Sequence, residues 1–286
     1  MENNNMRVIK ASKITKVVSD LCRIANTDAD QNVYKAICTA RNAETIPLAK
    51  TALDMIVQNM DIAKEEKMPM CQDTGMVIVF VEIGQEVYVK GNLKEAIQEG
   101  VRQSYRDNYF RASVVGDPIS RENTGDNTPA VIYYDIVEGN HLKITVMPKG
   151  FGSENKSALK MLNPSAGEAG VIQFIIDTVK TAGANPCPPM VIGVGVGGTM
   201  DKAALLSKQA LLRDVGSHNP DPYWAGIEKK LLMEVNNLNI GAAGFKGAAT
   251  AIGLNILTHP THIAGLPVAV NIGCHVSRHA SQILED

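Results

Sequence analysis

The sequence has no long apolar run, almost no excess of either charge and no apolar leader. No stretch of apolar residues reaches the roughly 18–20 that a helix needs to cross a bilayer. The net charge of -2 gives no sign of a surface for nucleic acid or for an acidic membrane. The chain begins Met-Glu-Asn-Asn-Asn-Met-Arg, which lacks the apolar core of a secretion signal. These absences predict a cytoplasmic protein that binds neither membranes nor nucleic acid.

Cysteine is also scarce, with five in 286 residues. That number, without a secretion signal, favours a reducing compartment over a disulfide framework. Hydrophobic residues account for 45% of the chain and charged residues for 20%, which is typical of globular proteins. The length is sufficient for a large core, so we expect a single domain over residues 1–286 that has room for two lobes.

Apolar spacing predicts an α/β protein of the mixed (α+β) type. The first 66 residues show helical periodicity, and a β-like run follows at 76–82. Asn92 is a typical N-cap for the next helix, with Glu95 as its capping-box partner. Further strands are expected at 130–137 and 142–147 as a hairpin, at 190–196 and at 267–272, and further helices at about 164–181, 199–213 and 222–238. This order gives a helical N-terminal region followed by mixed sheets with packed helices.

Three of the cysteines stand in turns rich in glycine, proline and asparagine. They are Cys71, Cys187 and Cys274, which lie far apart in the sequence. A sulfur in such a turn is accessible, and neighbouring amides stabilise its thiolate form. Three thiolates of this kind can hold a metal centre and leave one coordination position open. Cys22 and Cys38 instead fall in helical apolar stretches, where a free cysteine behaves as a small core residue.

The turn at Cys71 also carries groups suited to catalysis. Asp73 lies two residues from the thiolate and can act there as an acid or a base. Gln72 offers both a hydrogen-bond donor and an acceptor to a ligand. The same segment, Cys71-Gln-Asp-Thr-Gly75, also fits a capped turn before a strand, with Asp73 bonding backbone amides. Both interpretations stay open for this segment alone.

The histidines near the C-terminal end admit two interpretations. Four of the six are His259, His262, His275 and His279. With Cys274 they have the ligand types of a zinc site, and a helical tail would bring His275 and His279 onto one face. A single hydrogen-bonded histidine with a structural role is the commoner case.

A glycine-rich run and one arginine each admit a functional and a structural interpretation. The run from Gly193 to Gly198 has the letters of a dinucleotide-binding fingerprint. That motif requires a second strand that ends in an acidic residue, and no such strand is expected, so close backbone approach is the better explanation. Arg111 is suited either to clamping a carboxylate or to a surface ion pair.

Taken together, these segments resemble the class I, iron–sulfur-dependent fumarate hydratase family and its relative, L-tartrate dehydratase. The matching residues are Cys71-Gln-Asp-Thr-Gly75, Gly152-Ser-Glu-Asn155, Gly193-Val-Gly-Val-Gly-Gly-Thr199, His262 and Gly273-Cys274. The resemblance extends from about residue 10 to the end of the chain. It implies a [4Fe–4S] cluster held by Cys71, Cys187 and Cys274, with the fourth iron left open as a Lewis acid.

The resemblance also implies a hydro-lyase active site. Its substrate would be a small 2-hydroxy dicarboxylate, malate in equilibrium with fumarate, or alternatively L-tartrate. Gln72, Asp73, Arg111 and Gly152 would contact the substrate, and Asp73 would handle a proton with His262 close by. A non-catalytic protein that binds a metal or a cluster is the competing hypothesis, and an NAD-dependent oxidoreductase is a more distant one.

The resemblance further implies a partner chain. Single-chain relatives continue beyond the third cysteine into a second domain with further catalytic residues, whereas twelve residues follow Cys274 here. We therefore expect an α subunit that lacks the C-terminal catalytic domain. A separate β subunit would complete the active site, in an α2β2 assembly or around an α–α dimer.

Overall fold

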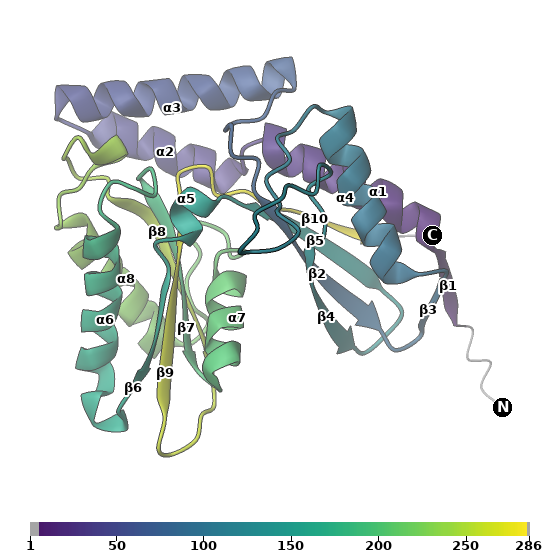
Figure 1. Cartoon of the computed structure of the whole chain (residues 1–286). Helices are drawn as coiled ribbons and strands as arrows, with labels where there is room; N and C mark the ends of the chain where they lie inside the picture. The colour runs from purple at the N-terminus through teal and green to yellow at the C-terminus, as the bar shows by residue number, and fades with distance from the viewer. Residues whose placement is uncertain (1–5, 285–286) are drawn as a thin grey trace. The chain divides into compact units, whose positions relative to one another are not determined.

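The computed structural model describes residues 6–284, and the first five residues of the polar N-terminus lie outside that range. The chain divides into two compact units (Figure 1). Unit 1 contains Ile62–Gly150 and the described parts of Met1–Ala29 and Arg278–Asp286, and unit 2 contains Asp30–Asp61 and Phe151–Ser277. Each unit combines helices with a mixed sheet, which confirms the expected α/β architecture.

Unit 1 is built on a four-stranded sheet with the strand order β10-β5-β2-β4. Its strands are β2 (Met76–Gly84), β4 (Val131–Val137), β5 (Leu142–Lys149) and β10 (Ala280–Leu284). β2 lies in the interior of the sheet, parallel to β4 and antiparallel to β5. It is apolar at nearly every position, as a strand covered on both faces should be. A separate parallel ribbon pairs β1 (Arg7–Lys10) with β3 (Val87–Lys90).

The prediction of a hairpin over residues 130–147 is wrong. Both of its strands exist, but β4 and β5 each pair with β2 and not with each other. Their connection crosses the end of β2, where the Gly84 amide donates to the His141 carbonyl at 2.8 Å. A buried strand needs partners at both edges to satisfy its backbone groups, and this requirement outweighs the short loop between β4 and β5.

Two helices, α1 (Ala11–Thr27) and α4 (Leu93–Asp107), pack against each other and against the sheet of unit 1. The apolar stripe predicted for α1 is buried in this contact. The helices approach closely at Gly100, where a Cβ would lie 2.6 Å from the Thr15 carbonyl oxygen. Asn92 caps α4 as predicted, because its side chain accepts from the Glu95 amide at 3.1 Å.

Unit 2 contains the second four-stranded sheet, in the order β6-β9-β7-β8. Its strands are β6 (Ala158–Leu162), β7 (Met190–Gly197), β8 (Ala251–His259) and β9 (Leu266–Gly273). β7 is parallel to β8 and antiparallel to β9. Helices α6 (Gly167–Ala182) and α8 (Pro222–Asn236) cover one face of this sheet, and α7 (Met200–Ala210) covers the other (Figure 1).

The remaining elements are α2 (Gln31–Ala43), α3 (Pro47–Glu66), α5 (Phe151–Glu154) and the 3-10 turns Pro164–Ala166 and Ala242–Gly244. With α1, the helices α2 and α3 account for the helical pattern predicted in the first 66 residues. Glu44 is buried between α2 and α3, and its carboxylate accepts from the Ala248 amide at 3.1 Å. This bond attaches the α2–α3 turn to the loop before β8.

The glycines at positions 193 and 195 allow α7 to lie directly on β7. A Cβ on Gly193 would lie 2.1 Å from the Ser207 carbonyl oxygen, and one on Gly195 would lie 2.1 Å from that of Ala203. The chain then passes from α7 to α8 with no strand between them. Helix–strand packing therefore explains these glycines, in agreement with the close-approach interpretation.

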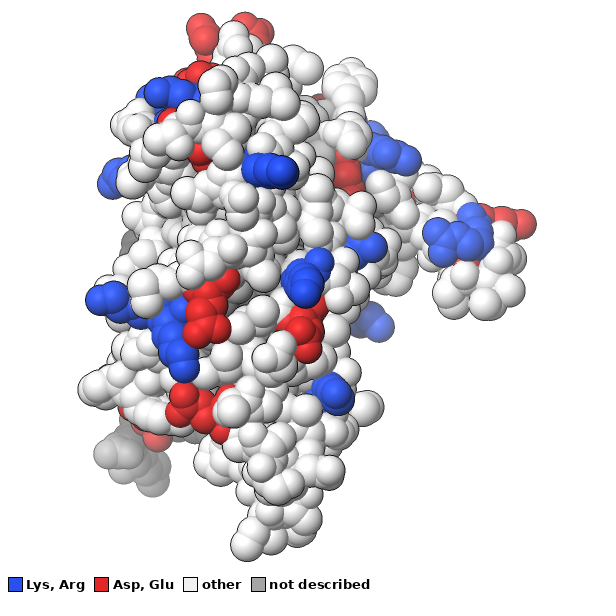
Figure 2. Space-filling model, turned by 90° about the vertical axis from the view of Figure 1, so that its left-hand side faces the viewer, with Lys and Arg blue, Asp and Glu red and all other residues white. Residues whose placement is uncertain are grey.

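Charged side chains are dispersed on the surface. Figure 2 shows one face on which acidic and basic residues are interspersed and neither sign forms a large area. This pattern agrees with the net charge of -2. Within residues 6–284, no helix is both long enough and apolar enough to pass through a bilayer.

Replacing Gly195 with alanine is expected to destabilise the chain. The new methyl group would meet the Ala203 carbonyl, and relieving that clash would cost about 1–3 kcal/mol. The urea concentration at the unfolding midpoint measures the loss. Gly226→Ala is the matched control, because no atom lies within 4 Å of its added Cβ in α8 and alanine favours the helix. Equal midpoints for the two variants would contradict the packing role of Gly195.

Candidate functional site

The turn that contains Cys71 lies directly before β2 in unit 1, and other segments bind its backbone. Tyr105 on α4 donates its hydroxyl to the carbonyl oxygens of Thr74 at 2.5 Å and Gly75 at 3.1 Å. Burial raises the pKa of Tyr105 above its usual range, so the hydroxyl stays protonated as a donor. Gly75 has a φ of +80°, and a Cβ there would lie 2.7 Å from the Lys149 amide nitrogen. Glycine is therefore required where this turn meets the end of β5.

The two carboxylate oxygens of Asp73 have different neighbours. Its Oδ1 accepts from the Gly75 amide at 3.0 Å, which confirms the capped turn. Its Oδ2 faces Gly150, where a Cβ would come within 3.2 Å of it. The neighbouring Gln72 is exposed, and its Oε1 lies 3.5 Å from the Cys71 sulfur. One carboxylate oxygen thus fixes the turn and the other faces the strand end, so the structural and the proton-handling roles are compatible.

Two side chains join this turn to the segment that contains Arg111. The Thr74 hydroxyl donates to the Arg111 carbonyl at 2.9 Å, while the Arg111 side chain itself is exposed. Asn127 is fully buried; it donates to the Gly75 carbonyl at 3.0 Å and accepts from the Ser113 amide at 2.8 Å. Unit 1 thus holds the turn and Arg111 at one end of its sheet.

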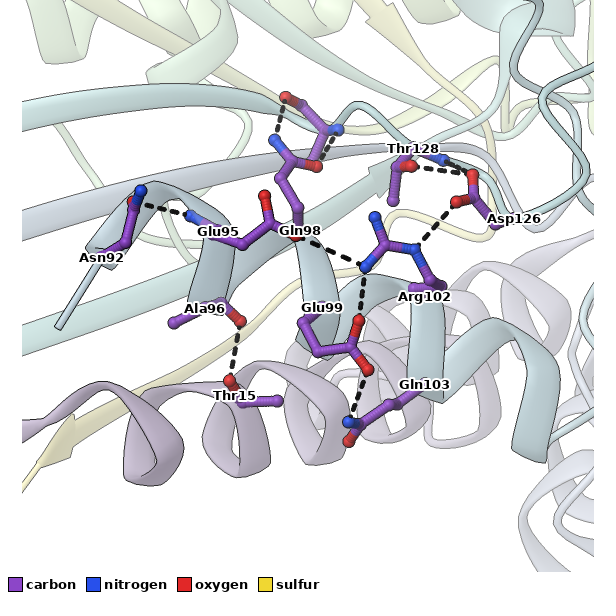
Figure 3. Close-up of polar contacts among 11 residues, drawn as sticks. Thr15, Asn92, Glu95, Ala96, Gln98, Glu99, Arg102, Gln103, Asp126 and Thr128 are labelled. Carbon is purple, nitrogen blue, oxygen red and sulfur yellow. Dashed lines mark hydrogen bonds and ion pairs between the residues drawn. The ribbon is translucent and has the colours of Figure 1, made fainter.

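A polar network on α4 fixes the loop around Asn127 (Figure 3). Arg102 Nε donates to Asp126 Oδ2 at 2.9 Å, and Asp126 Oδ1 accepts from the Thr128 hydroxyl at 2.7 Å. Burial acts against ionisation here, but hydrogen bonds from Thr128 and Arg102 lower the pKa of Asp126 to about 2. Gln98 Oε1 accepts from the Ala130 amide at 2.7 Å, and Gln98 Nε2 donates to the Ala130 carbonyl at 3.2 Å. The loop is therefore held on both sides of Asn127.

The role of Asn127 was not predicted from the sequence. Its φ of +59° is one that asparagine adopts more readily than most residues, and Asp-Asn-Thr-Pro is a typical turn sequence. A turn signal of this kind gives no information about distant contacts. The partner, Gly75, lies 52 positions earlier in the chain.

Cys187 and Cys274 lie at the same end of the sheet in unit 2. Cys187 precedes β7 and Cys274 follows β9, and these strands are antiparallel neighbours. The His275 amide donates to the Cys187 carbonyl at 3.2 Å, and its Nδ1 lies 2.8 Å from the same oxygen. Cys187 is exposed and has a φ of +54°, with prolines on both sides that stiffen the loop.

Gly152 lies in α5, at this same end of unit 2. Glu154 of this helix pairs with Lys208 and accepts from the Asn271 amide group on β9 at 3.2 Å. No atom lies within 4 Å of the position that a Cβ on Gly152 would take. Packing therefore does not require glycine here, and the position leaves open space at the strand end that precedes Cys274.

His262 lies at the opposite end of the same sheet. It is exposed in the loop between β8 and β9, where the Thr261 hydroxyl donates to the Gly198 carbonyl at 2.8 Å. The whole of β9 separates it from Cys274, and the rise of a strand puts about 25 Å between them. Unit 2 thus does not bring His262 to its own Cys187 and Cys274.

The structure provides no helical histidine pair for the zinc arrangement considered above. Residues 274–279 are irregular and lead into β10, so His275 and His279 do not share a helix face. In residues 6–284, no three His, Cys, Asp or Glu side chains are close enough to hold a metal ion. Cys71 belongs to unit 1, whereas Cys187 and Cys274 belong to unit 2.

The buried side-chain atoms without a hydrogen-bond partner are next to these cysteine segments. In the described part of the chain they are Asn26 Oδ1, Asn271 Oδ1 and Arg278 Nη1. The Asn26 carbonyl binds the amide of Met70, the residue before Cys71. Asn271 and Arg278 lie three residues before and four residues after Cys274. Unpartnered buried groups are unfavourable and often mark the place of a water, an ion or a ligand.

Comparison with known proteins identifies relatives along nearly the whole chain. A family model described as fumarate hydratase (Fumerase) matches residues 15–282. The chain is 41% identical over 275 residues to the putative L(+)-tartrate dehydratase subunit alpha of Methanocaldococcus jannaschii, which covers 94% of this chain and 96% of that protein. It is 29% identical over 286 residues to the L(+)-tartrate dehydratase subunit alpha of Escherichia coli O157:H7, which covers 99% and 94%.

Removing the Asn127 side chain is expected to loosen the turn before β2. Asn127→Ala leaves the Gly75 carbonyl and the Ser113 amide without this partner, which should lower the free energy of unfolding by about 1–3 kcal/mol. Urea unfolding measures the change. Asn123→Ala is the control, because its side chain also binds a backbone carbonyl but is exposed, and water can replace the bond. A similar loss in both variants would argue against a special role for Asn127.

Proposed function

We propose that this chain, which belongs to the fumarate hydratase family, is the α subunit of a [4Fe–4S]-dependent hydro-lyase. The family membership rests on the match over residues 15–282 and on a relative at 41% identity. The observation that carries the proposal is the nearly full-length similarity to proteins named as tartrate dehydratase α subunits. Since those names imply a second subunit, we propose a β subunit as the partner of this chain.

The substrate class is a small 2-hydroxy dicarboxylate, and we favour L-tartrate over malate. The similar proteins are named tartrate dehydratases, whereas the family description points to malate and fumarate. The two 2-hydroxy acids differ by one hydroxyl, which a site distinguishes through a few hydrogen bonds. Gln72 is exposed beside Cys71 and offers a donor and an acceptor for such a hydroxyl.

Cys71, Cys187 and Cys274 are the proposed cluster ligands. Two of them already stand at one end of unit 2. The third, Cys71, belongs to unit 1, where its turn precedes β2. Arg278 in turn is hydrogen-bonded to the carbonyl of Asp73, two residues from Cys71. The proposal that all three thiolates hold one cluster rests on the family match over residues 15–282.

The residues at these positions fit an iron–sulfur cluster. Accessible thiolates are its usual ligands, and unpartnered buried atoms adjoin the cysteine segments. Cys22 is unsuited to the role, because burial raises the pKa of its thiol well above the usual range and keeps it protonated. When bound, the cluster supplies an open iron that acts as a Lewis acid toward the departing hydroxyl.

The chain's own residues then bind the substrate and move one proton. Arg111 binds a substrate carboxylate through its planar, two-pronged guanidinium. Gly152 lets the backbone approach the ligand closely, since no neighbouring atom occupies the space beside it. Asp73 donates the proton that the departing hydroxyl needs to leave as water. The proton on the substrate carbon is removed by a residue of the β subunit.

His262 acts in the site of a second α subunit in this proposal. Within unit 2 it lies about 25 Å from Cys274, at the far end of β9. Its neighbour Ile263 is 92% exposed, as expected for a loop that projects toward another chain. A two-fold symmetric pair of α subunits would carry each His262 to the other subunit's site. The α–α contact would then be required for turnover.

Cluster binding can be measured directly on the purified chain. After anaerobic reconstitution we expect about four iron and four acid-labile sulfide atoms per chain. Cys71→Ser, Cys187→Ser and Cys274→Ser should each lose the cluster, while Cys22→Ser and Cys38→Ser should retain it. A wild-type chain without iron, or a cluster indifferent to the first three variants, would overturn the proposed cofactor.

Mixing two inactive variants tests both the role of Asp73 and the origin of His262. Asp73→Asn and His262→Asn should each abolish L-tartrate dehydration by the α and β subunits together, with the cluster intact. If each site takes Asp73 from one α subunit and His262 from the other, a random mixture regains about a quarter of wild-type activity.

The possible results of this mixing experiment are distinct. No recovery, with both parents inactive, would place the two residues in one subunit and contradict the shared site. Full turnover by Asp73→Asn alone would favour the competing hypothesis of a cluster-binding protein without a catalytic role. Turnover of malate in preference to L-tartrate would correct the substrate and leave the reaction class in place.

A further inference from the structure

Arg278 is a buried guanidinium for which the proposed reaction has no use. It lies in unit 1 just before β10, and 5% of its surface is exposed. Its Nε donates to the Pro148 carbonyl at 3.2 Å, and its Nη2 donates to the Asp73 carbonyl. These carbonyls belong to the end of β5 and to the turn before β2. Arg278 therefore ties two segments together, and they in turn fix the orientation of its guanidinium.

The third nitrogen of this guanidinium has no acceptor. Nη1 is buried and has no hydrogen-bond partner within residues 6–284. Arginine keeps its charge throughout the physiological pH range, and each terminal nitrogen carries two N–H donors. A charged donor left unpaired in the interior is strongly unfavourable. The structure thus points to an acceptor that arrives with a bound group.

We infer that Arg278 Nη1 donates a hydrogen bond to a sulfur of the bound cluster. The inference rests on the proposed function and adds a residue to it. Arg278 follows Cys274 by four positions and is hydrogen-bonded to Asp73, which follows Cys71 by two. Within unit 1, this bond attaches the guanidinium to the turn that carries the proposed ligand Cys71. A cluster with three thiolates is negatively charged, and a buried guanidinium is its natural complement.

Burial favours a resident group over the substrate as the acceptor. The substrate enters and leaves in every turnover, and its carboxylates need donors that solvent can reach. Arg111 is exposed and meets that condition, whereas Arg278 is buried and tied to the backbone on two sides. A cluster inserted once into the protein does not require repeated access. Arg278 is therefore a positioning residue that holds the cluster and the Asp73 turn in one arrangement.

A hydrogen bond of this kind has a measurable signature. Donors and positive charge near the sulfurs stabilise the reduced, more negative cluster and so raise its reduction potential. Arg278→Gln, which removes the charge, should lower the potential and speed the loss of iron several-fold. Arg278→Lys, which keeps the charge but not the planar fork, should have a smaller effect on both.

The experiment uses the full chain, reconstituted anaerobically with iron and sulfide. The midpoint potential of the cluster is measured by redox titration with EPR detection, and urea unfolding of the iron-free chain is measured in parallel. Arg213→Lys is the matched control, because Arg213 is also largely buried but pairs with Glu228 in unit 2. A lower potential in both Arg278 variants, with no change in the control, would support the inference.

The contrary results are equally clear. An unchanged potential with a lower urea midpoint would reduce Arg278 to a structural clamp and overturn the inference. A raised KM for tartrate in the presence of the β subunit, with an unchanged potential, would assign Nη1 to the substrate and overturn it as well. Absence of a cluster from the wild-type chain would contradict the proposed function itself, and with it the role of Arg278. If Arg278→Gln does not fold, the midpoint potential of the Arg278→Lys cluster decides: a lower value supports the inference and an unchanged one overturns it.

Discussion

The backbone carbonyls of the turn before β2 must find donors inside unit 1, and the arrangement of the candidate site follows from this requirement. Buried carbonyls without partners would be costly. Tyr105, Asn127 and Arg278 supply the donors, each from a different part of the chain. The helix α4, the loop after Arg111 and the segment before β10 are thereby fixed around one turn. Its rigidity is a product of tertiary contacts, with glycine needed at a single position for close approach.

In unit 2, the direction of the strands brings the loops with Cys187 and Cys274 together. Because β7 and β9 are antiparallel neighbours, the loop that enters one and the loop that leaves the other meet at one end of the sheet. Cys187 and Cys274 occupy these loops, and Gly152 lies at the same end. His262 lies at the opposite end of the strands. A sheet of this length cannot bring both of its ends to one ligand, which is why the proposed chemistry calls for more than one copy of the chain.

The proposed cluster ligands do not all belong to one compact unit. The described cysteines stand on two compact units, and the polar atoms left unpartnered in the interior lie next to the cysteine segments. A folded chain tolerates such atoms when a ligand completes their hydrogen bonds. Binding of the proposed cluster should therefore stabilise the chain. The proposed site and the contacts that organise unit 1 meet at Asp73, whose carbonyl accepts from Arg278 and whose carboxylate accepts from the Gly75 amide.

Local features of the sequence determined the helices, the buried strand β2, the Asn92 cap and the capped turn at Asp73, because each depends on neighbouring residues. The same holds for the cysteine turns and for the segments that identify the family. Tertiary structure alone decided that β2 separates β4 from β5, that Asn127 reaches Gly75, and that β9 separates His262 from Cys274. The physical reason is range: spacing and capping act over a few residues, whereas strand order and buried hydrogen bonds join residues far apart in the chain.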